Sequence, residues 1–467
     1  KKGVPMISRL ATLLALTVVV CGGGNSSDNK DALSAAREED LKAFLQWATA
    51  QGIRHEDRFR VAGTGDAGRG LVAVRDFQRG ETLLAVPEAA IFSPESASRS
   101  TVGKAFAEAG LVGCAGDTAS AKGAVTDACM QLLVATLLYE ASDPASFWAP
   151  WMKVLPRTLG SPLFWTKPEL LLLQGSNTLG MVAGWKKHIK GLYAPLNQRL
   201  FSKRRDMFPK KTFSLKQFTW GFATVFSRAF DIDVPRGASL RRERVMAPLA
   251  DLFNHGNVSS SYTFAADSAQ FQLVTHQVAR TGEEVLLNYD SKSNADFLFQ
   301  YGFVVPDNPS DEIGLVAGIG SDAPQYQEKM AVLAELGVSR DGAHRLAREG
   351  LPHPSLNAIR VLCAVPEEMP RARRVLQGKE ISAANNVCLW QTVSHAIQAM
   401  LDKYPESLIQ DEALLREEHS RQGLSPRART AITLRRDEKR ILLLNLARFK
   451  KRLSAARQAA DAQQQEL

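Results

Sequence analysis

The sequence predicts an α+β protein in which short strands lie on both sides of a helical segment and helices dominate the C-terminal part. Three observations support this prediction. Strand-like apolar runs occur near residues 70–87 and again near 260–289, a helical pattern fills about 100–230, and helical patterns prevail from about 320 onward. Because the two strand regions are distant in sequence, their strands must pair across the helical segment.

The predicted elements follow in chain order. Residues 37–51 carry apolar side chains at helical spacing. The runs "LVAV" and "TLLAVP", separated by "DFQRGE", predict a β-hairpin or a pair of short strands. "CMQLLVATLLYEA" predicts a buried helix, and "LKQFTWGFATVFSRAF" a helix with one apolar face. "SYTF", "FQLVTHQV" and "EEVLLNY" predict strands, and "SNADFLFQYGF" a short helix capped by Ser293 and ended by Gly302.

Composition and charge are those of an ordinary globular protein. The 467 residues are 45% hydrophobic and 23% charged, and this length allows two to four domains. The net charge is +9, and thirteen Lys or Arg against four Asp or Glu lie between Arg416 and Arg457. A solvated helix face is the simpler interpretation of that stretch, and an acidic partner is the alternative. The basic residues are not interleaved with aromatic ones as in a nucleic-acid-binding module, so no nucleic-acid partner is predicted.

The N-terminus and the cysteines indicate cellular context. Residues 1–30 form a targeting-like segment and linker, in which an apolar run from Leu10 to Val20 follows Arg9. The run is short for a membrane span, so no stable membrane association is expected after processing. The five cysteines contain no C-x-x-C pair. Neither a structural zinc site nor a disulfide framework is therefore expected, and a reducing compartment is favoured.

The stretch "DLFNHG" gathers Asp251, Asn254 and His255 in a short loop. A metal site would need a third ligand at recognisable spacing, and a nucleophilic triad would need an activated Ser or Cys. Neither is evident, so no metal is predicted. A turn closed by side-chain hydrogen bonds and a functional cluster are equally good interpretations of the pentapeptide alone.

Three further pieces have both a structural and a functional interpretation. The glycine-rich turn around Gly68, Arg69 and Gly70 matches neither the P-loop nor the dinucleotide fingerprint. In "FSRAF", an arginine at the end of an apolar helix also suits the helix dipole. A tyrosine such as those of "LLNYD" and "FQYGF" is usually a core residue, but two of them downstream of "DLFNHG" form a constellation.

In this order and spacing, the set resembles the SET-domain protein methyltransferases, and most closely the branch containing the Rubisco large-subunit lysine methyltransferase. The matching pieces are "GRGLVAVRDFQRGETLLAVP", "LLLQGSNTLG", "FSRAF", "DLFNHG", "RTGEEVLLNYDSKSNADFLFQYGF" and "LREEHSRQGLSPRARTAITLRRDEKRILLLNL". The resemblance covers about residues 38–455. It implies a SET domain at 38–306 with a helical insert at about 100–225, and a helical substrate-binding domain at 315–460.

The resemblance also implies roles for individual residues. The cofactor would be S-adenosyl-L-methionine, and the reaction would be methylation of a lysine on a non-histone protein substrate. Tyr289 matches the family's catalytic tyrosine. The expected cofactor-binding residues are Gly68, Arg69, Gly70, Arg228, Asn254, His255 and Tyr289, and the expected substrate-binding residues are Ser227, Asp251, Tyr262 and Tyr301. In the branch an acidic residue precedes the glycine turn, whereas this chain has Ala67 there, with Asp66 beside it.

Two other functions stay open at this level. Histidine methylation occurs in the same branch, although Tyr301 before "GF" favours lysine. A non-catalytic binding or scaffold protein with the same fold is the second alternative, supported only by Ala67. The resemblance and the targeting-like segment together predict a plastid location, with cytoplasm or nucleus as alternatives, and the protein is expected to be a monomer.

Overall fold

The computed structural model describes residues 26–64, 68–111, 113–114, 126–237, 239–338, 342–416 and 423–465. The chain divides into two compact units. Unit 1 consists of Lys1–Leu159 and Trp185–Asp290, and unit 2 of Gly160–Gly184 and Ser291–Leu467. The expected domain limits of 38–306 and 315–460 stay predictions, and the units differ from them by assigning residues 160–184 and 291–306 to the C-terminal body.

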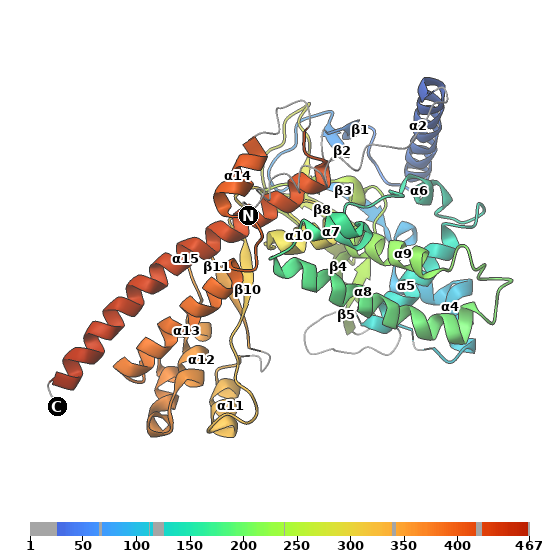
Figure 1. Cartoon of the computed structure of the whole chain (residues 1–467). Coiled ribbons are helices and arrows are strands. Elements are labelled where there is room, and N and C mark those ends of the chain that lie inside the picture. Colours follow the sequence, from blue (N-terminus) through green and yellow to red (C-terminus); the bar gives the residue numbers. More distant parts are fainter. Residues whose placement is uncertain are drawn as a thin grey trace, which may run out of the picture. The chain divides into compact units, whose positions relative to one another are not determined.

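The strands of unit 1 form several small sheets (Figure 1). β1 pairs with β2, β4 with β5, β6 with β9, and β8 lies between β3 and β7. The pairing of β3 with β8 confirms that strands from the two distant regions meet, since Val86 lies opposite Phe271. The bounds are β1 Phe59–Gly63, β2 Arg69–Ala73, β3 Thr82–Pro87, β4 Phe230–Arg236, β5 Ser239–Val245, β6 Asn254–His255, β7 Ser260–Ala265, β8 Gln270–Thr275 and β9 Leu286–Leu287.

The "LVAV" and "TLLAVP" runs are two separate strands and not one hairpin. β2 pairs with β1, which precedes it in the chain, whereas β3 pairs with β8. A second difference is the hairpin β4–β5, which lies between the predicted helical segment and "DLFNH". Its exposed face is strongly charged, with Arg244 bonded to Asp231 at 2.8 Å. Alternating charged and apolar residues are compatible with a half-buried strand, which explains why the hairpin forms here.

The helices of unit 1 bury the apolar faces that the sequence predicts. α5 is buried along most of its length, and α9 packs against it through Gly221, where Val134 approaches closely. The bounds are α2 Ser26–Ala50, α3 Pro94–Arg99, α4 Thr101–Glu108, α5 Asp127–Glu140, α6 Ala149–Val154, a π-helical turn Asn197–Phe201, and α9 Leu215–Arg228. α8, Asn177–Leu196, begins in unit 2 and ends in unit 1. α2 begins earlier than residue 37 and includes part of the expected linker.

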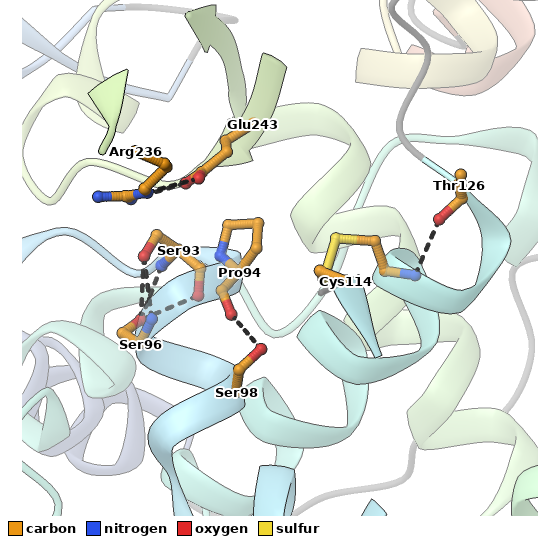
Figure 2. The surroundings of a disulfide bond; sticks show 9 residues. Ser93, Pro94, Ser96, Ser98, Cys114, Thr126, Arg236 and Glu243 are labelled. Carbon is orange, nitrogen blue, oxygen red and sulfur yellow. Dashed lines mark hydrogen bonds and ion pairs between the residues drawn. A yellow bond between two sulfur atoms is a disulfide. The ribbon is translucent and has the colours of Figure 1, made fainter. Parts of the chain in front are cut away.

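One disulfide joins Cys114 to Cys129 near the start of α5 (Figure 2). Thr126 caps this helix by accepting a hydrogen bond from the Cys129 N–H at 3.4 Å. The expectation of cysteines without disulfides is wrong for this pair. The two residues are 15 positions apart, a spacing that carries no signal by itself, and the local fold brings their Cα atoms to 4.5 Å.

Unit 2 is mainly helical, and its described residues also include two paired strands on either side of α11. β10 pairs antiparallel with β11, so the prediction of helices alone from residue 320 onward is wrong at β11. The short helix predicted in "SNADFLFQYGF" is confirmed, because Ser293 accepts from the Asp296 N–H and Gly302 adopts a left-handed conformation. The bounds are α7 Lys167–Leu171, α10 Asn294–Tyr301, β10 Glu312–Val316, α11 Tyr326–Glu335, β11 Ala343–Ala347, α12 His353–Cys363, a 3₁₀ segment Pro366–Gln377, α13 Ala383–Leu401, α14 Leu408–Arg416 and α15 Pro426–Gln465.

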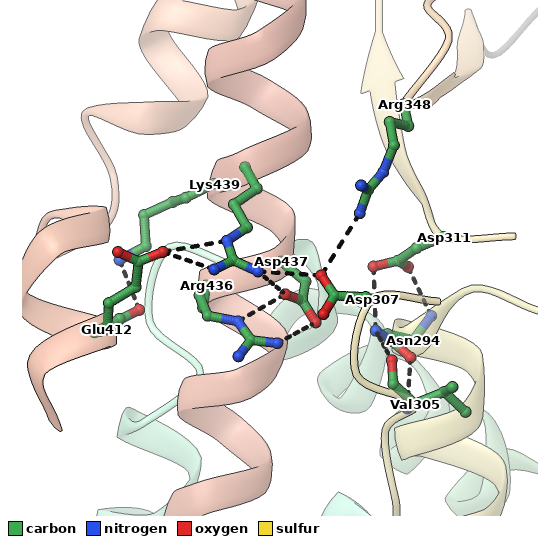
Figure 3. A network of polar contacts seen from close by, with 11 residues as sticks. Asn294, Val305, Asp307, Asp311, Arg348, Glu412, Arg436, Asp437 and Lys439 are labelled. Carbon is green, nitrogen blue, oxygen red and sulfur yellow. Dashed lines mark hydrogen bonds and ion pairs between the residues drawn. The ribbon is translucent and has the colours of Figure 1, made fainter. Parts of the chain in front are cut away.

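The long helix α15 (Figure 1) carries polar contacts as well as apolar packing. Figure 3 shows the partly exposed set, in which Arg436 bonds to Asp437 and Arg348 lies 3.9 Å from Asp307. A second set is buried. Arg435 is buried and bonds to Asp411 at 2.6 Å and to Glu406 at 2.8 Å. Nearby, Glu438 accepts hydrogen bonds from the hydroxyls of Ser176 and Tyr404, both at 2.8 Å. Several of the basic residues counted in this stretch therefore form ion pairs inside unit 2. The predicted solvated face does not account for these residues.

Two searches of the described residues bear on cellular context. None of the described helices is long and apolar enough to cross a membrane. Within the same residues, no group of three or more His, Cys, Asp or Glu side chains is arranged to hold a metal ion. The targeting-like segment, up to residue 25, lies outside the described residues.

Candidate functional site

Two short parallel strands bring the "DLFNH" loop beside Tyr289. Asn254 lies opposite Leu286 and His255 opposite Leu287, so the chain leaving β9 reaches Tyr289 next to the histidine. The Tyr289 backbone N–H donates to His255 Nδ1 at 3.2 Å, and the two rings lie 5.3 Å apart. Residues separated by more than thirty positions are thus held together by a two-residue ladder and one side-chain bond.

The Tyr289 phenol is buried and has a defined partner. Its hydroxyl donates to the carbonyl oxygen of Phe253. Burial raises the pKa of Tyr289 to about 12, with Arg228 opposing the shift. The phenol is therefore neutral near pH 7 and is unsuited to act as a base. It can orient a nitrogen through its oxygen, which keeps acceptor capacity while its hydrogen is donated.

The His255 imidazole acts as an acceptor inside the site. Its Nδ1 accepts from a backbone N–H, which requires that nitrogen to be unprotonated. Burial lowers the pKa of His255 below its ordinary value of 6.5, so the ring is neutral near pH 7. The histidine therefore fixes the position of Tyr289 and adds no positive charge.

The Asn254 side chain holds the glycine-rich turn. Its amide donates to the Arg69 carbonyl at 3.2 Å and to Glu284 at 2.7 Å. Gly70 lies directly against this contact, and a Cβ there would come within 2.3 Å of Glu284 Oε1 and 2.7 Å of Asn254 Nδ2. Glycine at this position is required by the close approach, and Asn254 connects the turn to the Tyr289 loop.

The side chain of Asp251, the first residue of the "DLFNH" stretch, is buried beside two partners, Arg228 and Trp151. Arg228 donates to the Asp251 carbonyl at 2.7 Å and lies 3.4 Å from its carboxylate. Trp151, on α6, donates to the same carboxylate at 3.3 Å. Burial raises the pKa of Asp251, and Arg228 opposes that shift. Sequence reasoning missed Trp151, because a tryptophan in an apolar helix gives no signal of a polar role.

The glycine-rich turn contributes a second guanidinium, that of Arg69, in addition to that of Arg228 at the end of α9. Arg69 donates to the Val154 carbonyl at 2.7 Å, and its pKa is lowered first by burial and then by the charge of Arg228. Gly68, at the start of the turn, has a φ of 83°, which favours glycine. The predicted cofactor-binding arginines therefore make one positively charged region near Asp251.

Two non-glycine residues with left-handed backbone flank the site. Leu249 has a φ of 73° immediately before Ala250–Leu252, and Asp290 has a φ of 87° immediately after Tyr289. Such conformations cost roughly 1–2 kcal/mol each for residues other than glycine. The surrounding packing holds them, since Leu249 is fully buried.

Two buried polar atoms at this position fit a bound ligand. Among the described residues, neither Arg228 Nε nor Asp251 Oδ1 has a hydrogen-bond partner. A buried donor or acceptor left unpaired costs about 1–3 kcal/mol, so such atoms mark places where a ligand completes the bonding. A guanidinium N–H suits a carboxylate, such as that of an amino-acid cofactor.

Besides Asp251, the predicted substrate-side residues of unit 1 lie on α9 and β7. Ser227 is in the last turn of α9, where its hydroxyl donates to the Thr224 carbonyl at 3.4 Å. Tyr262, on the edge strand β7, is 41% exposed and packs against Phe230 at 5.1 Å. A cavity of about 330 Å³ opens there, lined by Asp231, Ile232, Asp233, Arg242, Ser261, Tyr262 and Thr263. β7 begins beside the Tyr289 loop, because Ser260 Oγ accepts from the Asn288 N–H.

Two predictions concern residues that are not among the described residues of unit 1. Tyr301 belongs to unit 2, where it ends α10 and packs with Phe297 and Phe303 at 6.1 and 5.9 Å. Its role in substrate binding stays a prediction. Asp66 and Ala67, the departure from the family pattern, lie outside the described residues.

Comparison with known proteins adds family evidence to this geometry. Residues 68–290 match the model of the SET domain. Residues 320–442 match the model of the Rubisco LSMT substrate-binding domain. This chain carries a SET domain followed by a domain that matches the substrate-binding domain of Rubisco LSMT. The SET match begins at the glycine turn and ends after Tyr289, so it includes all the predicted cofactor-binding positions.

The curated proteins and the solved structures that are similar to this SET-domain protein are of two kinds. The actin-histidine N-methyltransferases of Papio anubis and Homo sapiens are 26% identical over 424 residues, covering 87% of this chain and 67% and 68% of those proteins. The structure of the SET domain of LSMT bound to lysine and AdoHcy has a TM-score of 0.76 at 23% identity, covering 90% of this chain and 93% of that one. Rubisco LSMT bound to AdoMet gives a TM-score of 0.75 at 24% identity, with the same coverage.

Proposed function

We propose that this chain is an S-adenosyl-L-methionine-dependent protein methyltransferase whose acceptor is a side-chain nitrogen of another protein. The observation that carries the proposal is the cluster of Tyr289, the "NH" strand and the glycine turn within the region that matches the SET domain. The LSMT structures bound to AdoMet and AdoHcy support the cofactor assignment.

Different residues of the site would contact different parts of such a cofactor. When bound, S-adenosyl-L-methionine supplies a methyl group on a positively charged sulfur. Arg228 would hold the carboxylate through its unpartnered Nε, and the turn at Gly68–Gly70 would contact the methionine part through backbone groups. Asn254 keeps that turn against the loop. The neutral Tyr289 oxygen and the neutral His255 ring leave the region without an added positive charge.

Lysine is our preferred acceptor on chemical grounds. The ε-amine must lose its proton before attack, and its reference pKa is about 10.4. Since Tyr289 is a poor base, the proton would leave to solvent, and dry aromatic surroundings would favour the neutral amine. Phe230, Tyr262 and Phe271 pack together beside the cavity and could provide such a wall. Aromatic faces also tolerate the methylated cation that forms.

Histidine is the second candidate, and the curated relatives favour it. The actin-histidine N-methyltransferases align with 87% of this chain, although identity is 26%. An imidazole has a reference pKa of about 6.5 and is largely neutral at pH 7, so it needs no dry channel. It does need hydrogen-bond partners that fix its tautomer, and Asp251 with its unpartnered Oδ1 is a candidate for that role.

The experiment supplies labelled S-adenosyl-L-methionine with the Rubisco large subunit or with actin. The modified residue is identified by hydrolysis to amino acids. Methyllysine would support the preferred acceptor, and methylhistidine the second. Tyr289→Phe should lose most of the transfer, whereas Tyr193→Phe, at a half-buried tyrosine outside the site, should retain it. Cofactor binding without transfer to either protein or to a whole extract would support the scaffold alternative and contradict the proposal.

The pH dependence separates the two acceptors independently of product analysis. For lysine, the rate should rise through pH 9, because the neutral amine fraction increases about tenfold for each pH unit below its pKa. For histidine, the rate should level off above about pH 7. A plastid location and a monomeric state are further proposals, testable by fusing residues 1–30 to a fluorescent reporter and by light scattering.

A further inference from the structure

Two cysteines of unit 2 lie together although they are distant in sequence. Cys363 is the last residue of α12, and Cys388 lies on the neighbouring helix α13. Both thiols contact the hydroxyl of Thr392, at 3.7 Å from Cys363 Sγ and 3.9 Å from Cys388 Sγ. Neither is in a disulfide, and both are half-buried, so a small reagent can reach them.

The two sulfurs share Thr392 as a neighbour, and each thiol shifts the pKa of the other. Cys363 is the first cause of the lowering of the Cys388 pKa to about 6. The interaction with Cys388, together with burial, raises the pKa of Cys363. Lys329, a largely buried ammonium that donates to the Leu362 carbonyl at 3.0 Å, lies close enough to favour negative charge on both sulfurs. Cys388 is thus the nucleophilic member of the pair.

We propose that Cys363 and Cys388 form a redox modification site that closes to a disulfide by exchange with a low-molecular-weight disulfide such as glutathione disulfide. The Cys388 thiolate attacks one sulfur of the reagent and expels one glutathione thiolate, leaving a mixed disulfide on Cys388. Cys363 then attacks Cys388 Sγ and expels the second glutathione. The two protein thiols are oxidised, the reagent disulfide is reduced, and both protons end on the two glutathione molecules.

The location gives the modification a structural consequence. α12 and α13 pack against each other within residues 320–442, which match the substrate-binding domain model. A disulfide would join the end of α12 to the first half of α13 and restrict their relative motion. The site does not depend on the proposed methyl transfer, because it involves no residue of the "DLFNH" or Tyr289 region.

The experiment uses the full chain, reduced only enough to leave Cys114–Cys129 intact, and exposed to glutathione disulfide at pH 6. Thiols are then blocked with an alkylating reagent and the peptides are analysed by mass spectrometry. Because the pKa of Cys388 is lowered, its thiolate fraction at this pH exceeds that of an ordinary thiol. After correction for the weaker nucleophilicity of an acidic thiolate, it should react about tenfold faster than an ordinary thiol. We expect a Cys363–Cys388 cross-linked peptide. Cys363→Ser should stop at glutathione bound to Cys388, and Cys388→Ser should lose the fast reaction.

A second measurement uses the chain without substitutions, so its result does not depend on whether the variants fold. A trivalent arsenical, which needs two adjacent thiols, should bind once per chain and block alkylation of both cysteines. The proposal is overturned if both cysteines remain alkylatable after glutathione treatment, if glutathione stays on Cys388 while Cys363 is intact, or if the cross-link found joins either cysteine to Cys114 or Cys129.

Discussion

Replacing Glu438 by glutamine should change the pH dependence of the stability of unit 2. The carboxyl is fully buried on α15, and burial raises its pKa from 4.5 to about 7 against the opposing hydrogen bonds from Ser176 and Tyr404. The folded-state pKa is higher than the unfolded one, so the stabilising contribution of the protonated carboxyl is complete below about pH 4.5. It is lost as pH rises through about 7, because the fold must then bury a charge.

The size of this effect follows from the shift. A difference between 4.5 and about 7 corresponds to about 3 kcal/mol in the free energy of unfolding at alkaline pH. Most of it, about 2–3 kcal/mol, develops between pH 5 and pH 8. Glutamine has a similar shape and does not titrate, so Glu438→Gln should gain this amount relative to the unsubstituted chain over that range. The amide nitrogen cannot accept a hydrogen bond, so one hydroxyl bond is lost, but that cost is independent of pH and leaves the slope unchanged.

The assay is urea unfolding at pH 5 and pH 8, with hydrogen exchange of α15 peptides to isolate unit 2 from unit 1. Glu328→Gln, an exposed position of α11, serves as the matched control for removing a surface carboxylate. An equal stability difference between Glu438→Gln and the unsubstituted chain at both pH values would refute the reasoning, since it would mean that the buried carboxyl keeps one protonation state throughout.

Three further predictions concern the candidate site. Gly70→Ala should displace Asn254 from Glu284 and weaken S-adenosyl-L-methionine binding roughly 10–100-fold by calorimetry, as expected for a lost hydrogen bond to a charged group, whereas Gly180→Ala, with open space around it, should bind normally. Trp151→Phe should leave Asp251 with one partner fewer and destabilise the fold by about 1–3 kcal/mol in thermal unfolding; an unchanged midpoint would contradict this. Tyr289→Phe should lower the transfer rate much more than cofactor affinity, and an equal loss of both would indicate a binding role only.

Local sequence patterns were enough to predict several of the elements and most of the residues that the structure brings together in unit 1 at the candidate site. A nearly continuous apolar run located α5, apolar periodicity located α9, and capping chemistry located both ends of α10, because these features depend on neighbours within a few residues. The order of "FSRAF", "DLFNHG" and "LLNYD" identified the methyltransferase-like region, which matches the SET domain over residues 68–290.

Contacts between residues distant in the chain became visible only in the folded structure. Trp151 contacts Asp251 across 100 positions, and Asn254 holds a turn that lies more than 180 positions earlier. The Cys114–Cys129 bond and the Cys363–Cys388 pair likewise follow from how helices pack, since neither spacing is a recognised motif. Pairing of this kind depends on the loss of chain entropy and on burial summed over the whole unit, so a local pattern carries no record of it.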